Sequence, residues 1–278
     1  MIDDLLQYLS FPFVRNALVA GVLISLCAAL LGVSLVLRRL SFIGDGLSHV
    51  AFGAMAVATV LDFAGDLSLS LPITVACSLI LFMTGRTSQT KGDAALAMLS
   101  VGAMAIGYML MNVFPSSSNV TGDVCTTLFG SMTILTLTTG ELWTCVILSL
   151  AVILFQLLTY HRSFEFAFDD EFARASGGGV TVFNMFSAVV VAVVIVISMR
   201  LVGTLLVSAL LVFPAVSALR MCRSYLAVTL CSAILAVSGA LVGILAAVVA
   251  GTPVGATIVV VNMTVFLVCY VIGRMRKM

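Results

Sequence analysis

An aspartate and a histidine stand four positions apart at the edge of an apolar run, in the stretch FIGDGLSHVAFGAM at residues 42–55. On a helix, this spacing places Asp45 and His49 on one face. A carboxylate oxygen and an imidazole nitrogen are donors that suit divalent first-row ions such as zinc, manganese and ferrous iron. The pair is therefore a candidate for a metal-coordinating or gating site.

Each of the two residues also has an ordinary structural interpretation. Asp45 follows Gly44 and is among the best residue types for the N-cap of a helix. His49 fits a core histidine that is hydrogen-bonded to a neighbouring helix. The metal interpretation gains weight if these residues lie in lipid, where polar side chains are costly and mark functional sites by default.

The composition places most of the chain in lipid. Of its 278 residues 62% are hydrophobic and only 9% are charged, and the mean hydropathy is +1.26. Soluble domains average about 25% charged residues. The long unbroken apolar runs differ from the alternating segments of roughly 10 residues that build an outer-membrane barrel. The sequence therefore predicts an all-α polytopic membrane protein, with its seven single cysteines used for packing.

Nine apolar segments are candidates for membrane-spanning helices of roughly 17–25 residues. They lie near 13–37, 43–61, 69–84, 94–114, 139–159, 180–198, 201–219, 225–249 and 255–273, and the third is short. The apolar stretch 120–138 predicts a short re-entrant or interfacial helix instead. No separate soluble domain fits, so residues 1–278 form one transmembrane domain with about eight or nine spans.

The positive residues predict the orientation. With Arg38 and Arg39 inside, alternation of the spans places eleven of the thirteen Lys and Arg in the cytoplasm, and only Arg15 and Arg200 outside. We therefore expect the N-terminus outside and the C-terminus in the cytoplasm. A net charge of +1 offers no basis for binding nucleic acid.

The longest charged interruption is YHRSFEFAFDDEFARASGGG at 160–179, which this orientation places in the cytoplasm. Its segment DDEFARA suits a short helix with Asp169 or Asp170 at the N-cap, Arg174 in the last turn and the glycines beyond it. Such a helix would present aromatic and charged side chains to a cytosolic partner. The alternative is an amphipathic loop that its aromatic residues anchor at the membrane interface.

At DDEFARASGGG the chain resembles the coupling helix of type II ATP-binding-cassette importers. Three further stretches resemble more narrowly the zinc, manganese and iron permeases of that class: LVLRRLSFIGDGLSHVAFG (35–53), VGTLLVSALLVFPAVSALR (202–220) and TPVGATIVVVN (252–262). The resemblance covers nearly the whole chain. The chain departs from the family at Gly251, where members often carry Asp, and at LFGSM (128–132), where members often carry Gly-Asp after Leu-Phe.

The resemblance implies a permease that moves a zinc, manganese or iron ion along the axis of a dimer, usually a homodimer, in the inner membrane of a bacterium. It assigns Asp45 and His49 to the metal path. An extracytoplasmic binding protein would deliver the ion. ATP would be hydrolysed by a separate cytosolic ATPase dimer, since no GxxxxGK[ST] motif occurs in this chain. The permease would then be no enzyme itself and would hold no covalently bound cofactor.

Two further groups of residues are site candidates. The segment that the ATPase would contact carries Glu165, Asp169, Asp170, Glu171, Phe172, Arg174 and Gly177. Small residues and prolines permit close helix approach or kinks and suggest a pore wall or dimer seam, although ordinary helix packing explains them equally well. These are Gly203, Ser208, Pro214, Pro253 and Gly255.

Other functions stay open at this point. A permease for metal chelates such as siderophore or haem would usually be longer. A self-contained secondary transporter would show intramembrane acids on several helices and inverted repeats with broken helices, which are not evident in the sequence. A membrane scaffold would leave the Asp45–His49 pair unexplained. The donor types fit zinc, manganese and iron alike.

Overall fold

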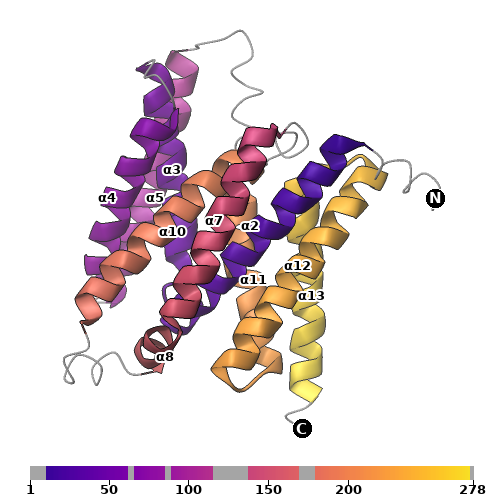
Figure 1. The fold of residues 1–278 in the computed structure, drawn as a ribbon. Coiled ribbons are helices and arrows are strands. Elements are labelled where there is room, and N and C mark those ends of the chain that lie inside the picture. The colour runs from indigo at the N-terminus through magenta and orange to yellow at the C-terminus, as the bar shows by residue number, and fades with distance from the viewer. Residues whose placement is uncertain (1–10, 62–65, 85–88, 115–136, 169–178, 276–278) are drawn as a thin grey trace.

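The protein is a bundle of helices (Figure 1). The computed structural model describes residues 11–61, 66–84, 89–114, 137–168 and 179–275, without the side chains of 66–68, 83–84 and 89–93. In chain order its helices are α2 (Pro12–Leu37), α3 (Ser41–Val60), α4 (Asp66–Thr84), α5 (Gln89–Val113), α7 (Thr139–Leu158), α8 (Tyr160–Phe168), α10 (Val180–Val202), α11 (Thr204–Met221), α12 (Tyr225–Ala250) and α13 (Val254–Met275).

The nine predicted apolar segments each coincide with a helix. Within the described ranges, eight helices are long and apolar enough to cross a membrane, and the apolar part of α4, Leu69–Phe82, is shorter. The prediction of an all-α polytopic membrane protein is confirmed. The break after 198 was placed too early, because α10 continues to Val202 and the chain turns at Gly203, whose φ of 92° favours glycine.

The stretch 120–138 lies almost wholly outside the described residues, so its predicted re-entrant helix is not addressed. Its last two residues lead into α7. Thr138 is the N-cap of α7, and its backbone N–H donates to Glu141 Oε2 at 2.9 Å while its side chain accepts from the Glu141 backbone. This capping box satisfies N–H groups that the start of a helix leaves unpaired.

The basic clusters gather at one end of the bundle. Figure 1 shows the end of α2, the helix α8, the connection from α11 to α12 and the end of α13 at its lower end, whereas α2 begins and α10 ends at the upper end. Arg38, Arg162, Arg220 and Arg274 belong to the first group, and Arg15 and Arg200 to the second. This segregation is what the positive-inside rule requires, and the rule predicts that the lower end is cytoplasmic.

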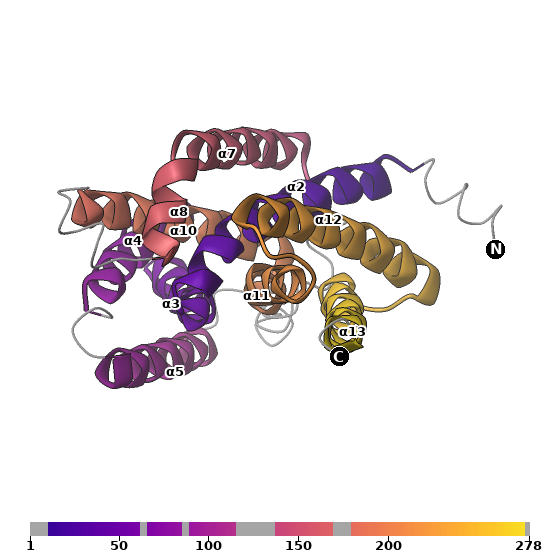
Figure 2. The ribbon, with the colours of Figure 1, turned by 90° about the horizontal axis from the view of Figure 1, so that it is seen from below.

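Helix α11 occupies the middle of the bundle and packs against α2, α3, α12 and α13 (Figure 2). The spans α2, α3, α10 and α11 are more than half buried, whereas α5, α7 and α13 are less than a third buried. Figure 2 shows α7 on one side of the bundle and α5 on the opposite side. The inner helices therefore fix the positions of any residues they carry.

Glycines set the closest helix contacts. A Cβ added at Gly32 in α2 would lie 2.0 Å from the backbone oxygen of Leu211 in α11, and one added at Gly53 in α3 would lie 2.6 Å from that of Ala103 in α5. Small residues allow helix backbones to approach closely in membranes, where packing replaces the hydrophobic effect as the driving force. The relative register of α2, α3, α5 and α11 is fixed by such contacts.

Candidate functional site

Asp45 and His49 lie one turn apart on α3, as their spacing predicted. His49 Nε2 is 3.7 Å from Asp45 Oδ1. The Asp45 side chain is 52% exposed and that of His49 is 19% exposed. A carboxylate and an imidazole that converge on one side of a helix, with the carboxylate accessible, can present an oxygen and a nitrogen to the same cation.

The interpretation of Asp45 as an N-cap is wrong. Helix α3 begins at Ser41, so Asp45 lies inside its first turns. The flanking glycines also lie inside the helix, where they make room for side chains of neighbouring helices. A Cβ at Gly44 would lie 2.7 Å from Leu211 Cδ1, and one at Gly46 would lie 2.5 Å from Leu96 Cδ1. The Asp45 carboxylate is therefore free of a capping role.

His49 is not anchored to a neighbouring helix by a hydrogen bond among the described residues. Its Nδ1 is buried and has no hydrogen-bond partner there, and Nε2 faces Asp45. Ser48 beside it donates to the Asp45 backbone oxygen at 2.7 Å, so its hydroxyl is not used by the side chain of Asp45 or of His49. Because Nδ1 is buried, Nε2 is the ring nitrogen placed to bind a cation together with Asp45.

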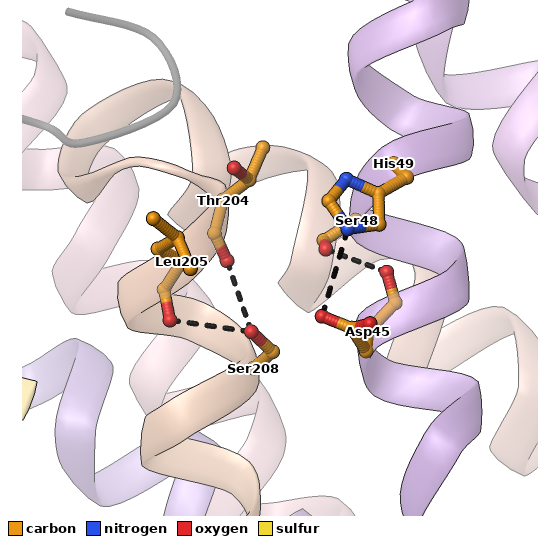
Figure 3. A network of polar contacts seen from close by, with 6 residues as sticks. All are labelled: Asp45, Ser48, His49, Thr204, Leu205 and Ser208. Atoms are coloured by element: carbon orange, nitrogen blue, oxygen red, sulfur yellow. Dashed lines mark hydrogen bonds and ion pairs between the residues drawn. The ribbon is translucent and has the colours of Figure 1, made fainter. Parts of the chain in front are cut away.

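Ser208 of α11 lies opposite this pair. Figure 3 shows the Asp45 carboxylate directed toward α11, with Ser208 on the facing side of that helix. The contact between Gly44 and Leu211, three residues after Ser208, fixes this register. The Ser208 hydroxyl lies 3.2 Å from the Leu205 backbone oxygen and donates within its own helix. Of the sequence-predicted small residues, Ser208 thus faces Asp45 from the neighbouring helix.

The other small residues and prolines of the predicted pore or seam lie elsewhere. Gly203 forms the turn before α11, and Pro214 is buried inside that helix. Pro253 precedes α13, and Gly255 is buried in its first turn. The structure does not bring these four residues together with the Asp45–His49 pair, so their predicted role rests on the sequence.

A cavity of about 340 Å³ opens beside Asp45, between α3 and α5. It is lined by Phe42, Asp45, Gly46, Leu96, Ala97, Ser100 and Val101. Because Asp45 lines this space, a cation can approach the residue without displacing the helix core. Among the described residues no group of three or more His, Cys, Asp and Glu side chains could hold a metal ion. A two-donor site of this kind binds a cation weakly, which suits passage more than storage.

The predicted ATPase-contacting segment is described only in part. Glu165 is exposed on α8, and the six candidates from Asp169 to Gly177 lie outside the described residues. Helix α8 is held by its buried Phe166, whose ring centroid is 4.7 Å from that of Phe183 in α10. The contact of Phe166 with Phe183 therefore holds α8 against the start of α10.

Sequence reasoning missed one polar contact near this end of the bundle. Arg38, at the end of α2, donates from Nη2 to Asn184 Oδ1 in α10. Asn184 is 3% exposed. A single amide in the apolar run VTVFNMF was the signal that could have identified it, because buried polar groups in spans need partners.

Comparisons with known proteins identify relatives over the whole length of the chain. The ABC 3 transport family matches residues 10–273. The manganese import system permease protein ScaB of Streptococcus gordonii is 28% identical over 281 residues, which cover 100% of this chain and 98% of ScaB. A protein of Haemophilus influenzae named as a probable iron transport system membrane protein is 27% identical and covers 99% of both chains.

The fold also has a solved counterpart. One chain of PsaBC from Streptococcus pneumoniae, solved in complex with Fab, superimposes with a TM-score of 0.85 over 97% of this chain and 95% of that one, at 24% sequence identity. The arrangement of helices is therefore that of this solved structure.

Proposed function

Because the chain belongs to the ABC 3 transport family, we propose that it is the permease subunit of an ATP-driven importer that moves a divalent transition metal ion through the bacterial cell membrane. The eight described spans make it a multi-pass membrane protein. The observation that carries the metal assignment is the pair of possible metal ligands on α3, His49 Nε2 and Asp45 Oδ1, 3.7 Å apart, with Asp45 lining a cavity.

The chemistry of the pair supports an ion that is bound briefly. The Asp45 carboxylate supplies charge and one or two oxygens, and His49 supplies a neutral nitrogen. Together they replace part of the hydration shell of a divalent ion, and the remaining ligands would be water or a second copy of the pair from a partner protomer. In a homodimer whose twofold axis passes near α3, two Asp and two His would share one ion, and the ATPase could open or close that site by moving the protomers.

Zinc, manganese and iron all accept these donors. The manganese permease ScaB and the iron-transport relative support the class without choosing among its members. The import cycle would also need an extracytoplasmic metal-binding protein, a cytosolic ATPase dimer that engages the 160–179 loop, and a second protomer. All 278 residues would act as one permease domain. A permease for metal chelates would need a wider path than one lined by paired single-ion donors.

Uptake into proteoliposomes tests the proposal. The full-length chain is reconstituted with and without its ATPase. Radiolabelled zinc, manganese or iron is offered on one side of the membrane, and ATP is supplied on the side that carries the ATPase. We expect uptake only with the ATPase, and a loss of about 100-fold in Asp45→Ala and His49→Ala, because each removes one of two first ligands. Ser48→Ala is the matched control, since its hydroxyl donates to the Asp45 backbone within α3.

The outcomes separate the competing functions. Metal movement without an ATPase but with an ion gradient would identify a secondary transporter. Uptake that persists in both Asp45→Ala and His49→Ala at normal protein levels would refute the metal site. Uptake of a metal chelate in place of the bare ion, unaffected by the two substitutions, would identify the chelate permease.

A further inference from the structure

A second, smaller pocket lies at the ends of α11 and α13, away from the Asp45–His49 pair. Its volume is about 200 Å³, and it is lined by Arg220, Tyr270, Gly273 and Arg274. Two of these four residues are arginines, and none is acidic. Both helices end at the lower end of the bundle in Figure 1, which the positive residues predict to be cytoplasmic.

Close packing of the two helices builds this pocket. A Cβ added at Gly273 would lie 2.9 Å from the backbone oxygen of Arg220, so the absence of a side chain lets α13 approach the end of α11. The Arg220 guanidinium carbon lies 5.3 Å from the centroid of the Tyr270 ring, within reach of a cation–π contact. A cation–π contact does not use up the N–H groups of the guanidinium, so they remain able to donate.

The two arginines carry charge that the described part of the chain does not neutralise by ion pairs. Neither Arg220 nor Arg274 forms an ion pair with a described acidic residue, and both are exposed. Each lies in the last turn of its helix, where the dipole offsets part of one positive charge. Two guanidinium groups around one pocket still present several donors to an anion. Guanidinium forks match phosphate oxygens in bidentate geometry.

The apolar surface next to the pocket indicates which kind of phosphate-bearing molecule would fit there. Along the preceding turns of α13, Leu267, Val268 and Val271 are each more than half exposed. In a membrane this surface contacts acyl chains, and the arginines that follow it stand at the depth of the lipid headgroups. Basic pockets between helix ends on the cytoplasmic side bind anionic headgroups in other membrane proteins.

We propose that the pocket of Arg220, Tyr270 and Arg274 binds a phosphate group, and that the ligand is an anionic phospholipid whose acyl chains lie along α13. The bound lipid would hold the ends of α11 and α13 together. Since α11 carries Ser208 at the candidate metal site, the lipid would stabilise the helix that faces Asp45 and His49. This inference concerns a different site from the metal pair and stands whether or not the chain transports a metal.

Thermal unfolding of the purified full-length chain in detergent tests the proposal. Short-chain phosphatidylglycerol, short-chain phosphatidylcholine and inorganic phosphate are titrated separately. We expect phosphatidylglycerol alone to raise Tm, and Arg220→Gln with Arg274→Gln to weaken its apparent affinity by about tenfold or more. Arg223→Gln is the matched control, because Arg223 is exposed in the same connection but does not line the pocket.

Each result bears on the proposal. Arg220→Lys keeps the charge but loses the fork and the stacking geometry, so an affinity between those of the wild type and the double variant supports the pocket. An equal loss in Arg223→Gln would mean diffuse surface attraction and would overturn it. An equal effect of inorganic phosphate would overturn the assignment to a lipid. The Tm of each variant without lipid shows whether it is folded, and a direct lipid-binding measurement by native mass spectrometry then decides the case for any variant of lowered Tm.

Discussion

Arg38 and Asn184 join the end of α2 to the first turns of α10 through a hydrogen bond between residues 146 positions apart. Arg38 is the C-cap of α2, and Arg39 after it has a left-handed φ of 58°, which is uncommon for a residue with a side chain. Helix α3, with Asp45 and His49, begins two residues later. The bond therefore holds the connection that leads into the candidate metal site against the helix that follows the 160–179 loop.

We expect Asn184→Ala to lower the free energy of unfolding by about 1–3 kcal/mol, because it leaves a guanidinium donor without this acceptor at a part-buried site. Asn184→Asp keeps an acceptor and should retain most of the stability. Thermal unfolding of the purified chain in detergent measures both. The control is Asn112→Ala, since Asn112 is exposed and, within the described ranges, bonds only to Tyr108 of its own helix. Equal losses in the Asn184 and Asn112 variants would contradict a special role for the bond.

Two glycines give opposite expectations for the same substitution. In Gly32→Ala the new Cβ would meet the Leu211 backbone oxygen at 2.0 Å, so α2 and α11 must separate, at a cost of about 3 kcal/mol or more. In Gly102→Ala nothing lies within 4 Å, and the better helix propensity should stabilise the chain by up to about 1 kcal/mol. The monodisperse fraction after heating, followed by size-exclusion chromatography, compares them. A Gly32→Ala variant as stable as Gly102→Ala would refute the close contact.

The spans could be predicted from sequence because the thickness of the membrane sets the length of each apolar run. All nine segments coincide with helices for this reason. The beginning of α3 could not be predicted in the same way. Gly44, Asp45 and Gly46 have low helix propensity, and the side chains that fill the space beside the glycines, Leu211 and Leu96, come from other helices. Tertiary packing outweighed the local signal that suggested an N-cap.

In the candidate site, too, local spacing could be predicted from the sequence and contacts between helices could not. The four-residue spacing of Asp45 and His49 defines their common face wherever the helix lies, so their approach to 3.7 Å was within reach of the sequence. The position of Ser208 opposite them depends on the register of α3 against α11, which the contacts of Leu211 with Gly32 and Gly44 determine. The partner of Asn184 could not be predicted either, because no local sequence pattern pairs it with Arg38.

We expect the size of the side chain at position 208 to affect the rate of metal transport more than its hydroxyl group does. The hydroxyl donates to its own helix, so Ser208→Ala should keep metal uptake within about twofold of the wild type. Ser208→Phe places a ring on the face directed at Asp45 and should lower uptake by about tenfold or more, since a wrongly filled site obstructs ligand access. Uptake into proteoliposomes with the ATPase measures both.

Ser238→Phe is the control for the added ring. Ser238 is exposed on α12 and likewise donates to a carbonyl of its own helix, that of Leu235 at 3.1 Å. Its variant should transport at the wild-type rate. If Ser208→Phe transports as well as Ser238→Phe at equal levels of folded protein, Ser208 lies outside the metal path.

The donor type at position 45 should set which ions the protein prefers. Asp45 offers a hard oxygen, which manganese accepts well, whereas a thiolate is softer and favours zinc. We expect Asp45→Cys to lower the ratio of manganese to zinc uptake by about tenfold, and Asp45→Glu, which keeps the oxygen donors, to leave this ratio near that of the wild type. Uptake of the two radiolabelled ions offered together to the same proteoliposomes gives the ratio directly and cancels differences in the amount of active protein. Direct coordination requires the ratio to change with the donor atom. If Asp45→Cys slows both ions equally, the carboxylate attracts cations through its charge alone, and the first ligands must be sought on other residues that face the α3–α11 contact.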